Sequence, residues 1–279
     1  MLPQIEAFTG AEHLPFKHLG GKPAALLVHG FPGTPNDLRP LAEALNAEGW
    51  TTDAPLLPGF GRDIGDISNY GFKDWLGVVK NHLNDLKRDH SPLLLVGHSM
   101  GGALSINAAA ELEVDALLLL APFYKINHAL WSMLPMLQRI APQVKPFKLF
   151  KPDFTDTAFR DAVTKFVPAF DFDNPTHQAA VREFAVPVRV LGQVRDAGLK
   201  AYANAPKINV PTMVIQGIRD PLVLPQNTRL LAARFGGVCQ WVDVDGEHEI
   251  NRSDLLSWPD VKKAALTFAA TLLAIPKKD

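Results

Sequence analysis

Gly97-His98-Ser99-Met100-Gly101 is the segment whose residue types are best suited to chemistry. It follows the apolar run 93–96 and precedes a helix-like segment at 103–110. A strand that turns sharply into a helix exposes a serine at the turn, and the strained backbone requires small neighbours on both sides. The amino end of the following helix would face a carbonyl group at which negative charge develops. The pattern therefore predicts Ser99 as a nucleophile for acyl transfer.

Nine histidines are candidates for the base, which is needed because a serine hydroxyl is too weakly acidic to attack an ester unaided at neutral pH. In folds with this strand–turn–helix element, the chain order is serine, acid, histidine. That order excludes every histidine before the serine. His128 and His177 fall in an irregular region described below. His248, in the loop 245–250 before the last helix-like segment, is therefore the predicted base.

The carboxylate that orients the histidine is expected at the tip of a neighbouring strand. Asp220 follows the apolar run 212–215 and a glycine, and is the favoured acid. Asp243 and Asp245 are the alternatives because they are close to the histidine in sequence. Asp196 falls in the irregular region.

The apolar run 24–28 enters a glycine-rich loop that begins His29-Gly30-Phe31. An oxyanion hole in such a fold combines the N–H after the nucleophile with an N–H from the loop after an early strand. These donors would be the backbone N–H groups of Met100 and Phe31. We expect His29 to buttress the loop by hydrogen bonding rather than to transfer protons. An ordinary strand-to-helix turn is the alternative interpretation.

Short apolar runs recur along the chain, and helix-like segments separate them. Runs without alternation are typical of strands buried on both faces of a parallel sheet. They occupy residues 24–28, 93–96, 116–120, 212–215 and 239–242, with a weaker candidate at 50–54. Helical spacing is shown by Leu38, Leu41, Ala42 and Leu45, and by Val261, Ala265, Phe268 and Leu272, with Ser257 and Asp260 placed to cap the second helix. The sequence predicts an α/β fold with a mostly parallel central sheet and helices on both faces.

The alternation breaks between about residues 123 and 211, where prolines and aromatic residues are frequent and the run 186–191 is ambiguous. We predict a core of residues 1–122 and 207–279. Residues 123–206 would form a mostly helical insertion after the third-from-last core strand, covering the carboxyl end of the sheet as a cap. A separate small domain is the alternative.

Composition narrows the class of partner. Lys plus Arg is 28 and Asp plus Glu is 29, so the net charge is −1, which suits a neutral, apolar substrate better than nucleic acid or an anionic membrane. The single cysteine, Cys239, excludes an internal disulfide and is expected to be a buried core residue. No secretion signal or bilayer-spanning run is evident. We expect a cytoplasmic monomer or homodimer without membrane insertion.

Metal and nucleotide chemistry have no motif in this sequence. H-E-x-x-H, paired cysteines and a P-loop are all absent. Glu247-His248-Glu249 contains ligand-type side chains, but successive side chains of a loop seldom converge on one ion. We therefore expect no metal and no cofactor.

The motifs resemble those of the carboxylesterase and monoacylglycerol lipase family of the α/β-hydrolase superfamily. The similarity covers most of the chain outside the insertion, in the segments 21–61 (oxyanion loop, first helix and next strand), 97–102 (nucleophile turn), 210–220 (acid strand) and 246–250 (histidine loop). The resemblance implies hydrolysis of carboxylic esters, with acyl or monoglyceride substrates held under a helical cap. It carries over the roles of Ser99, Asp220, His248, Phe31 and Met100. The family often has Pro-Gly-His-Gly where this chain has Pro58-Gly59-Phe60-Gly61, which leaves substrate inference from that loop open.

The acyl pocket is expected to use apolar residues on the insertion side, namely Phe123, Tyr124, Trp131, Met133 and Met136, for which plain core positions are the alternative. Amidase or peptidase activity and carbon–carbon bond hydrolysis are alternatives on the same three residues. A noncatalytic binding protein is disfavoured because serine, acid and histidine are all present.

Overall fold

The computed structural model describes residues 7–127, 129–140, 142–145, 152–167, 170–183 and 185–274. A seven-stranded sheet forms its centre, in the order β1-β3-β2-β4-β5-β8-β9. The strands are β1 (Phe16–His18), β2 (Ala24–Val28), β3 (Thr51–Ala54), β4 (Leu93–His98), β5 (Ala116–Leu120), β8 (Thr212–Gly217) and β9 (Cys239–Val244). Only β1 runs antiparallel to its neighbour in this sheet. The predicted mostly parallel sheet is confirmed.

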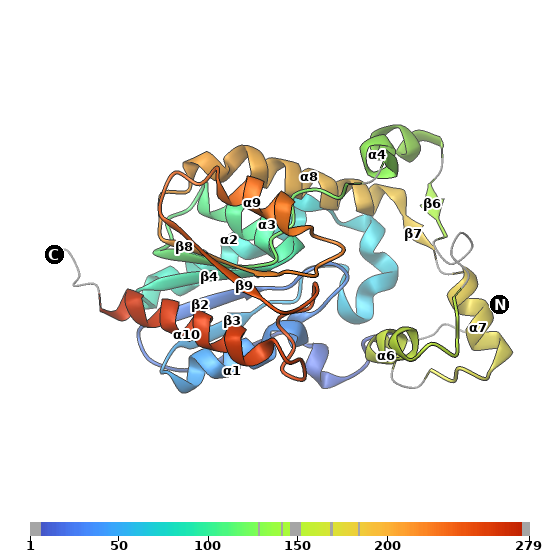
Figure 1. The fold of residues 1–279 in the computed structure, drawn as a ribbon, viewed down its shortest axis with the longest axis horizontal. Coiled ribbons are helices and arrows are strands. Elements are labelled where there is room, and N and C mark those ends of the chain that lie inside the picture. Colours follow the sequence, from blue (N-terminus) through green and yellow to red (C-terminus); the bar gives the residue numbers. More distant parts are fainter. Residues whose placement is uncertain are drawn as a thin grey trace.

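Helices cover both faces of the sheet, as Figure 1 shows. Helices α1 (Arg39–Ala47) and α10 (Trp258–Leu273) lie on one face, where Leu41 and Phe268 pack against strand residues such as Leu27. Helices α2 (Phe72–Asp89), α3 (Met100–Ala109) and α8 (Val188–Asn204) cover the other face, where Trp75 and Leu104 are fully buried. Each such side chain contributes about 1.5–3 kcal/mol by leaving water. Helix α9 (Pro225–Ala232) joins β8 to β9.

The apolar runs differ in how deeply the sheet buries them. Strands β2, β4, β5 and β8 are buried at every position, and the weaker run at 50–54 is the real strand β3. The run 239–242 was predicted to be buried on both faces, which is wrong: β9 is an edge strand with a partly exposed pattern. Cys239 at its start is only half-buried rather than a core residue. At the edge of the sheet β9 has a strand on one side only, so part of its side-chain surface stays open to solvent.

The insertion between β5 and β8 is mainly helical. It contains α4 (Ala129–Ile140), β6 (Gln143–Val144), α6 (Thr157–Phe166), α7 (Pro175–Glu183), β7 (Val186–Pro187) and α8. The ambiguous run 186–191 is thus two strand residues followed by the start of α8. Phe154, Phe170 and Phe172 form a small apolar cluster of the insertion's own. In Figure 1, α4, α6 and α7 lie at the end of the molecule opposite the C-terminus.

Helix α8 ties the insertion to the core. Asn204 Nδ2 donates to Asn107 Oδ1 of α3 at 2.9 Å, and Asn107 Nδ2 donates to the carbonyl of Ala197 at 3.0 Å. A side chain on Gly198 would stand 2.6 Å from the carbonyl oxygen of Tyr124, so glycine permits this close approach. The last helix of the insertion is therefore also part of the core packing.

Candidate active site

Ser99 stands at a strained turn between β4 and α3. Its φ of 52° lies in the left-handed region that non-glycine residues rarely adopt. A Cβ on Gly97 would lie 2.4 Å from the carbonyl oxygen of Gly101, and a Cβ on Gly101 would lie 2.0 Å from that of Val28. Both glycines are therefore required by packing. The Ser99 N–H donates to the Leu120 carbonyl at 2.9 Å, which anchors the turn to β5.

Ser99, His248 and Asp220 meet at the carboxyl ends of the strands. His248 Nε2 lies 2.9 Å from Ser99 Oγ, and His248 Nδ1 lies 2.7 Å from Asp220 Oδ2. The Asp220 side chain is fully buried and that of His248 is 15% exposed. As a carboxylate, Asp220 can accept hydrogen bonds but cannot donate them. His248 Nδ1 therefore carries the proton, and Nε2 is free to accept the serine proton. The structure thus brings together the three residues predicted as nucleophile, base and acid.

Backbone contacts join the acid loop to the histidine loop. The Ile218 N–H donates to the Val244 carbonyl and the Arg219 N–H to the Gly246 carbonyl, both at 3.0 Å. A Cβ on Gly217 would lie 2.1 Å from the carbonyl oxygen of Glu247. The absence of a side chain at this position lets the histidine loop pack directly on the end of β8. In the sequence this glycine indicates the end of a strand, but no local pattern predicts the close approach.

The alternative acids point elsewhere. Asp243 accepts hydrogen bonds from Arg229 at 2.7 Å and Trp241 Nε1 at 2.8 Å. Asp245 forms an ion pair with Arg219, and Asp196 pairs with its neighbour Arg195 at 3.5 Å. These surface pairs leave Asp220 as the carboxylate that contacts His248.

His29 holds the loop after β2. Its buried ring accepts a hydrogen bond from the Leu57 N–H at Nε2, 3.1 Å, so Nδ1 carries the proton and donates to the Gly30 carbonyl at 2.9 Å. In a trans peptide the next N–H points opposite to the carbonyl, so this bond sets the direction of the Phe31 N–H. Gly30 lies against the nucleophile, since a Cβ there would be 3.1 Å from Ser99 Cβ.

The second expected donor is the N–H of Met100, the first residue of α3. First-turn N–H groups of a helix have no acceptor within the helix and carry its positive dipole end. This N–H lies next to Ser99 in the chain. Its position suits an oxyanion formed on attack by the serine.

The charges of the site are fixed by burial and hydrogen bonding. Burial raises the pKa of Asp220, but the hydrogen bond and charge of His248, together with the N–H groups of Val223 and Leu222, outweigh it and leave that pKa below its usual value. Burial lowers the pKa of His98 and of His29 to about 4, so both are neutral at pH 7. A neutral His98 donates its Nε2–H to the His248 carbonyl at 3.1 Å. His98 therefore supports the histidine loop.

A pocket of about 520 Å³ adjoins the base, and His248, His98 and Phe31 line it together with Thr164 of α6. Its other walls come mainly from residues of the segments 12–13, 36–43 and 249–254, many of them polar or charged, although apolar atoms make up more of the exposed lining than polar atoms. None of the five residues predicted for an acyl pocket lines it. Phe123 and Tyr124 are buried in the core, Trp131 packs against Phe123, and Met133 and Met136 are 42% and 56% exposed. Their substrate role stays a prediction.

Within the ranges that the structure describes, no three His, Cys, Asp or Glu side chains are arranged to hold a metal ion. Within the same ranges, every helix is too short or too polar to cross a membrane. His128 lies outside the described residues.

Two curated relatives of this chain are named as a monoacylglycerol lipase and a carboxylesterase. A thermostable monoacylglycerol lipase from Bacillus sp. (strain H-257) is 39% identical over 109 residues, which is 39% of this chain and 43% of that enzyme. A carboxylesterase from Bacillus subtilis (strain 168) is 24% identical over 220 residues, covering 78% of this chain and 80% of that enzyme. The similarity to the first thus spans less than half of that enzyme, whereas the second is matched over most of its length.

Solved structures share the whole architecture. A structure from work on the metagenome-derived lipolytic enzymes LipS and LipT superposes with a TM-score of 0.73 at 19% identity, covering 94% of this chain and 98% of that chain. A monoacylglycerol lipase from Paleococcus ferrophilus gives 0.67 at 19% identity, covering 92% and 98%. At this identity the similarity shows the fold alone. The serine aminopeptidase S33 family model matches residues 21–250, a range that contains Ser99, Asp220 and His248. The chain therefore has the α/β-hydrolase fold and belongs to the serine aminopeptidase S33 family.

Proposed function

We propose that this chain is a serine hydrolase that cleaves carboxylic esters of short to medium acyl groups, or monoacylglycerols, through an acyl-enzyme on Ser99. The observation that carries the proposal is the pair of contacts at His248, which lies 2.9 Å from Ser99 Oγ and 2.7 Å from Asp220 Oδ2. A hydroxyl, a base and an orienting carboxylate in this sequence of contacts are what nucleophilic acyl transfer requires.

In the first half of the reaction, Ser99 Oγ attacks the ester carbonyl while its proton passes to His248 Nε2. The N–H groups of Phe31 and Met100 bind the resulting oxyanion. The tetrahedral intermediate then collapses, the bond to the alcohol oxygen breaks, and that oxygen takes the proton from His248. The alcohol leaves, and the acyl group stays on Ser99.

In the second half, a water molecule gives a proton to His248 Nε2 and attacks the acyl carbonyl. The intermediate collapses, Ser99 Oγ recovers the proton, and the carboxylic acid is released. Asp220 keeps the imidazole oriented and stabilises the positive charge that it carries between the proton transfers. Asp220 itself is not protonated in either half.

We further propose that residues 123–206 act as the cap of this enzyme. The supporting observation is that Thr164 of α6 lines the same pocket as His248 and Phe31. Substrate entering this pocket would touch both the insertion and the core. The substrate is expected to be a small, uncharged ester.

The test is hydrolysis of p-nitrophenyl esters of graded acyl length by the wild type and Ser99→Ala. We expect the variant to lose at least about 10³-fold in kcat, because the remaining oxyanion donors alone supply only part of the rate enhancement. Wild-type enzyme should also be labelled by a fluorophosphonate, and Ser99→Ala should not. Equal activity of the two proteins would remove the assignment of the nucleophile.

Aminopeptidase activity is the second candidate, favoured by the description of the family whose model matches residues 21–250. The same three residues can cleave an amide, since the leaving amine also takes its proton from the histidine. Aminoacyl p-nitroanilides and p-nitrophenyl esters of the same amino acids separate the two. Turnover of the anilides at a rate near that of the esters would favour the peptidase.

A further inference from the structure

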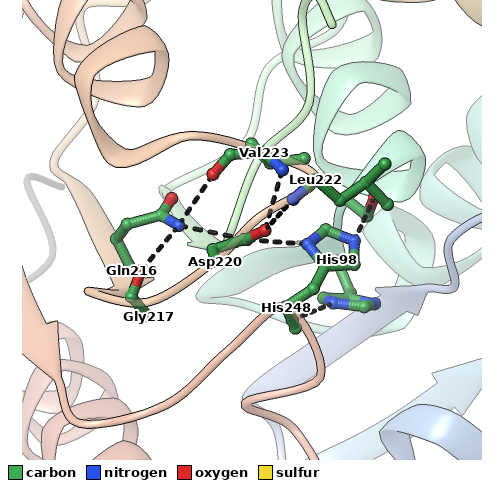
Figure 2. A network of polar contacts seen from close by, with 8 residues as sticks. His98, Gln216, Gly217, Asp220, Leu222, Val223 and His248 are labelled. Atoms are coloured by element: carbon green, nitrogen blue, oxygen red, sulfur yellow. Dashed lines mark hydrogen bonds and ion pairs between the residues drawn. The ribbon is translucent and has the colours of Figure 1, made fainter.

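Gln216, at the carboxyl end of β8, is fully buried beside the acid. Its Nε2 lies 3.2 Å from Asp220 Oδ2, 3.1 Å from the Val223 carbonyl oxygen and 3.2 Å from that of Gly217, as the dashed lines in Figure 2 show. All three partners are acceptors without hydrogens. The amide nitrogen rather than the amide oxygen must therefore face them, which fixes the orientation of the side chain.

The Asp220 carboxylate is saturated with donors. Oδ1 accepts the N–H groups of Leu222 at 2.9 Å and Val223 at 2.8 Å, and Oδ2 accepts His248 Nδ1–H at 2.7 Å and the Gln216 amide at 3.2 Å. A carboxylate offers about four lone-pair sites, so each is used. Gln216 is the one side chain among these donors besides the base itself. It shares with His248 the oxygen that faces the base.

We propose that Gln216 is a positioning residue that acts through Asp220, an inference that rests on the proposed function. By donating to Oδ2 it fixes the plane of the carboxylate, and it withdraws part of the negative charge that this oxygen offers to His248. Without the amide, Oδ2 would hold the protonated imidazole more strongly and in a less defined direction. The base would then stay protonated to a higher pH, which moves the acid limb, and the less defined direction of its ring would make transfer of the serine proton less efficient.

The other ionisable groups around the pair do not duplicate this contact. His98 is neutral above about pH 5 because burial lowers its pKa to about 4, and it touches the carbonyl of His248 rather than the ring nitrogens. Arg219 and Asp245 form an ion pair with each other on the two adjoining loops. Glu249 follows His248 in the chain and contacts Arg252. Gln216 is thus the polar side chain placed to adjust Oδ2 directly.

Gln216→Met tests the proposal, because methionine has a similar length but no donor. Thr212→Val is the matched control: it removes a buried hydrogen bond, Thr212 Oγ1 to the Val210 carbonyl at 3.1 Å, at the other end of the same strand. The measurement is kcat and KM for a p-nitrophenyl ester as a function of pH. For Gln216→Met we expect the acid limb of kcat/KM to move up by about half a pH unit and the plateau kcat to fall about tenfold with KM within twofold. Thr212→Val should keep the wild-type limb.

An unchanged limb in Gln216→Met, with only a lower melting temperature, would overturn the proposal because a merely structural residue behaves in that way. If this variant does not fold, Gln216→Asn replaces it, since its amide is one methylene too short for Asp220 but keeps a polar group at the site. The low-field proton resonance of the Asp220–His248 bond, titrated in the Ser99→Ala background, gives the same shift without turnover. If this shift is seen while the wild-type protein hydrolyses no ester, the proposed function is refuted and the role of Gln216 is not.

Discussion

The Asp220 carboxylate, which contacts His248 Nδ1, determines which ring nitrogen carries the proton. An amide at position 220 would present an N–H or a weaker acceptor to Nδ1, so the imidazole could settle in the wrong tautomer. We expect Asp220→Asn to fold and to lose about 10⁴-fold in kcat for a p-nitrophenyl ester. Steady-state kinetics at pH 7 measure the loss.

Asp243→Asn is the matched control for that experiment. Asp243 lies on the neighbouring strand β9 and pairs with Arg229 at the surface, where an ion pair contributes at most about 1 kcal/mol. Its kcat should stay within twofold of the wild type. A large loss in Asp243→Asn with little change in Asp220→Asn would exchange the two assignments.

Residue types and chain order were sufficient to predict which side chains meet. Ser99 is marked by flanking glycines that packing requires, and the order serine, acid, histidine leaves few candidates for the other two positions. The contacts of Gln216 and His98 were not predictable in the same way. They depend on side-chain directions within a strand and a turn, and a glutamine at the end of an apolar run carries no local signal of what it will touch.

The end of β8 brings the acid and histidine loops together because Gly217 has no side chain. In Gly217→Ala the new methyl group would meet the Glu247 carbonyl at about the 2.1 Å seen for an ideal Cβ, so the histidine loop must move away. We expect kcat/KM to fall by at least about 100-fold, since displacement of a reacting group by 1 Å has that effect. The rate of fluorophosphonate labelling should fall in parallel.

Gly77→Ala is the control for Gly217→Ala, because it makes the same substitution at a position with free space. Gly77 lies within α2 and a Cβ there meets nothing within 4 Å, so alanine should raise the free energy of unfolding by about 0.5–1 kcal/mol and leave labelling unchanged. Urea unfolding of both variants checks that the Gly217 effect is local. Normal labelling of Gly217→Ala would show that the loop tolerates the methyl group.

Strands that are buried on both faces were easier to predict from the sequence than the strand at the edge of the sheet. Runs such as 93–96 and 116–120 are continuous because both faces of the strand are covered, and they appear as β4 and β5. The run 239–242 has a similar composition but forms the edge, and strand order depends on contacts between distant segments that no local pattern contains. Ser257 is the N-cap of α10 as expected, yet its side chain makes no capping hydrogen bond. Position along the chain was correct there, and side-chain geometry was not.

The molecule as a whole should lose stability in mild acid. His29 and His98 have pKa values of about 4 in the folded chain because burial excludes their charged forms, against 6.5 when unfolded. The unfolded state therefore binds more protons between pH 6.5 and 4, and stability falls as the pH falls through this window. Each histidine should lower the free energy of unfolding by about 2 kcal/mol when the pH falls from 7 to 5. Urea unfolding at the two pH values measures the sum.

His82 has the opposite effect on the pH dependence of stability, and it therefore provides a control. The Asp53 hydrogen bond raises the pKa of His82. The contribution of His82 to the free energy of unfolding is therefore complete below pH 6.5 and is lost as the pH rises through its pKa in the folded state. His82→Gln should therefore lower stability at pH 5 and have little effect well above the raised value. Its side chain is 37% exposed, which screens the effect, so the buried histidines dominate. Greater stability at pH 5 than at pH 7 in the wild type would contradict this account.

The double attachment of α8 has a consequence for how new specificities could arise on this scaffold. Because α8 is locked to α3 through Asn107 and to Tyr124 through Gly198, the stretch between Tyr124 and the start of α8 hangs from two fixed points. A different segment placed between those points would leave the site residues of the core in place. It would change only which molecules reach them. That stretch could therefore be exchanged, in evolution or by design, while Ser99, Asp220 and His248 keep their positions.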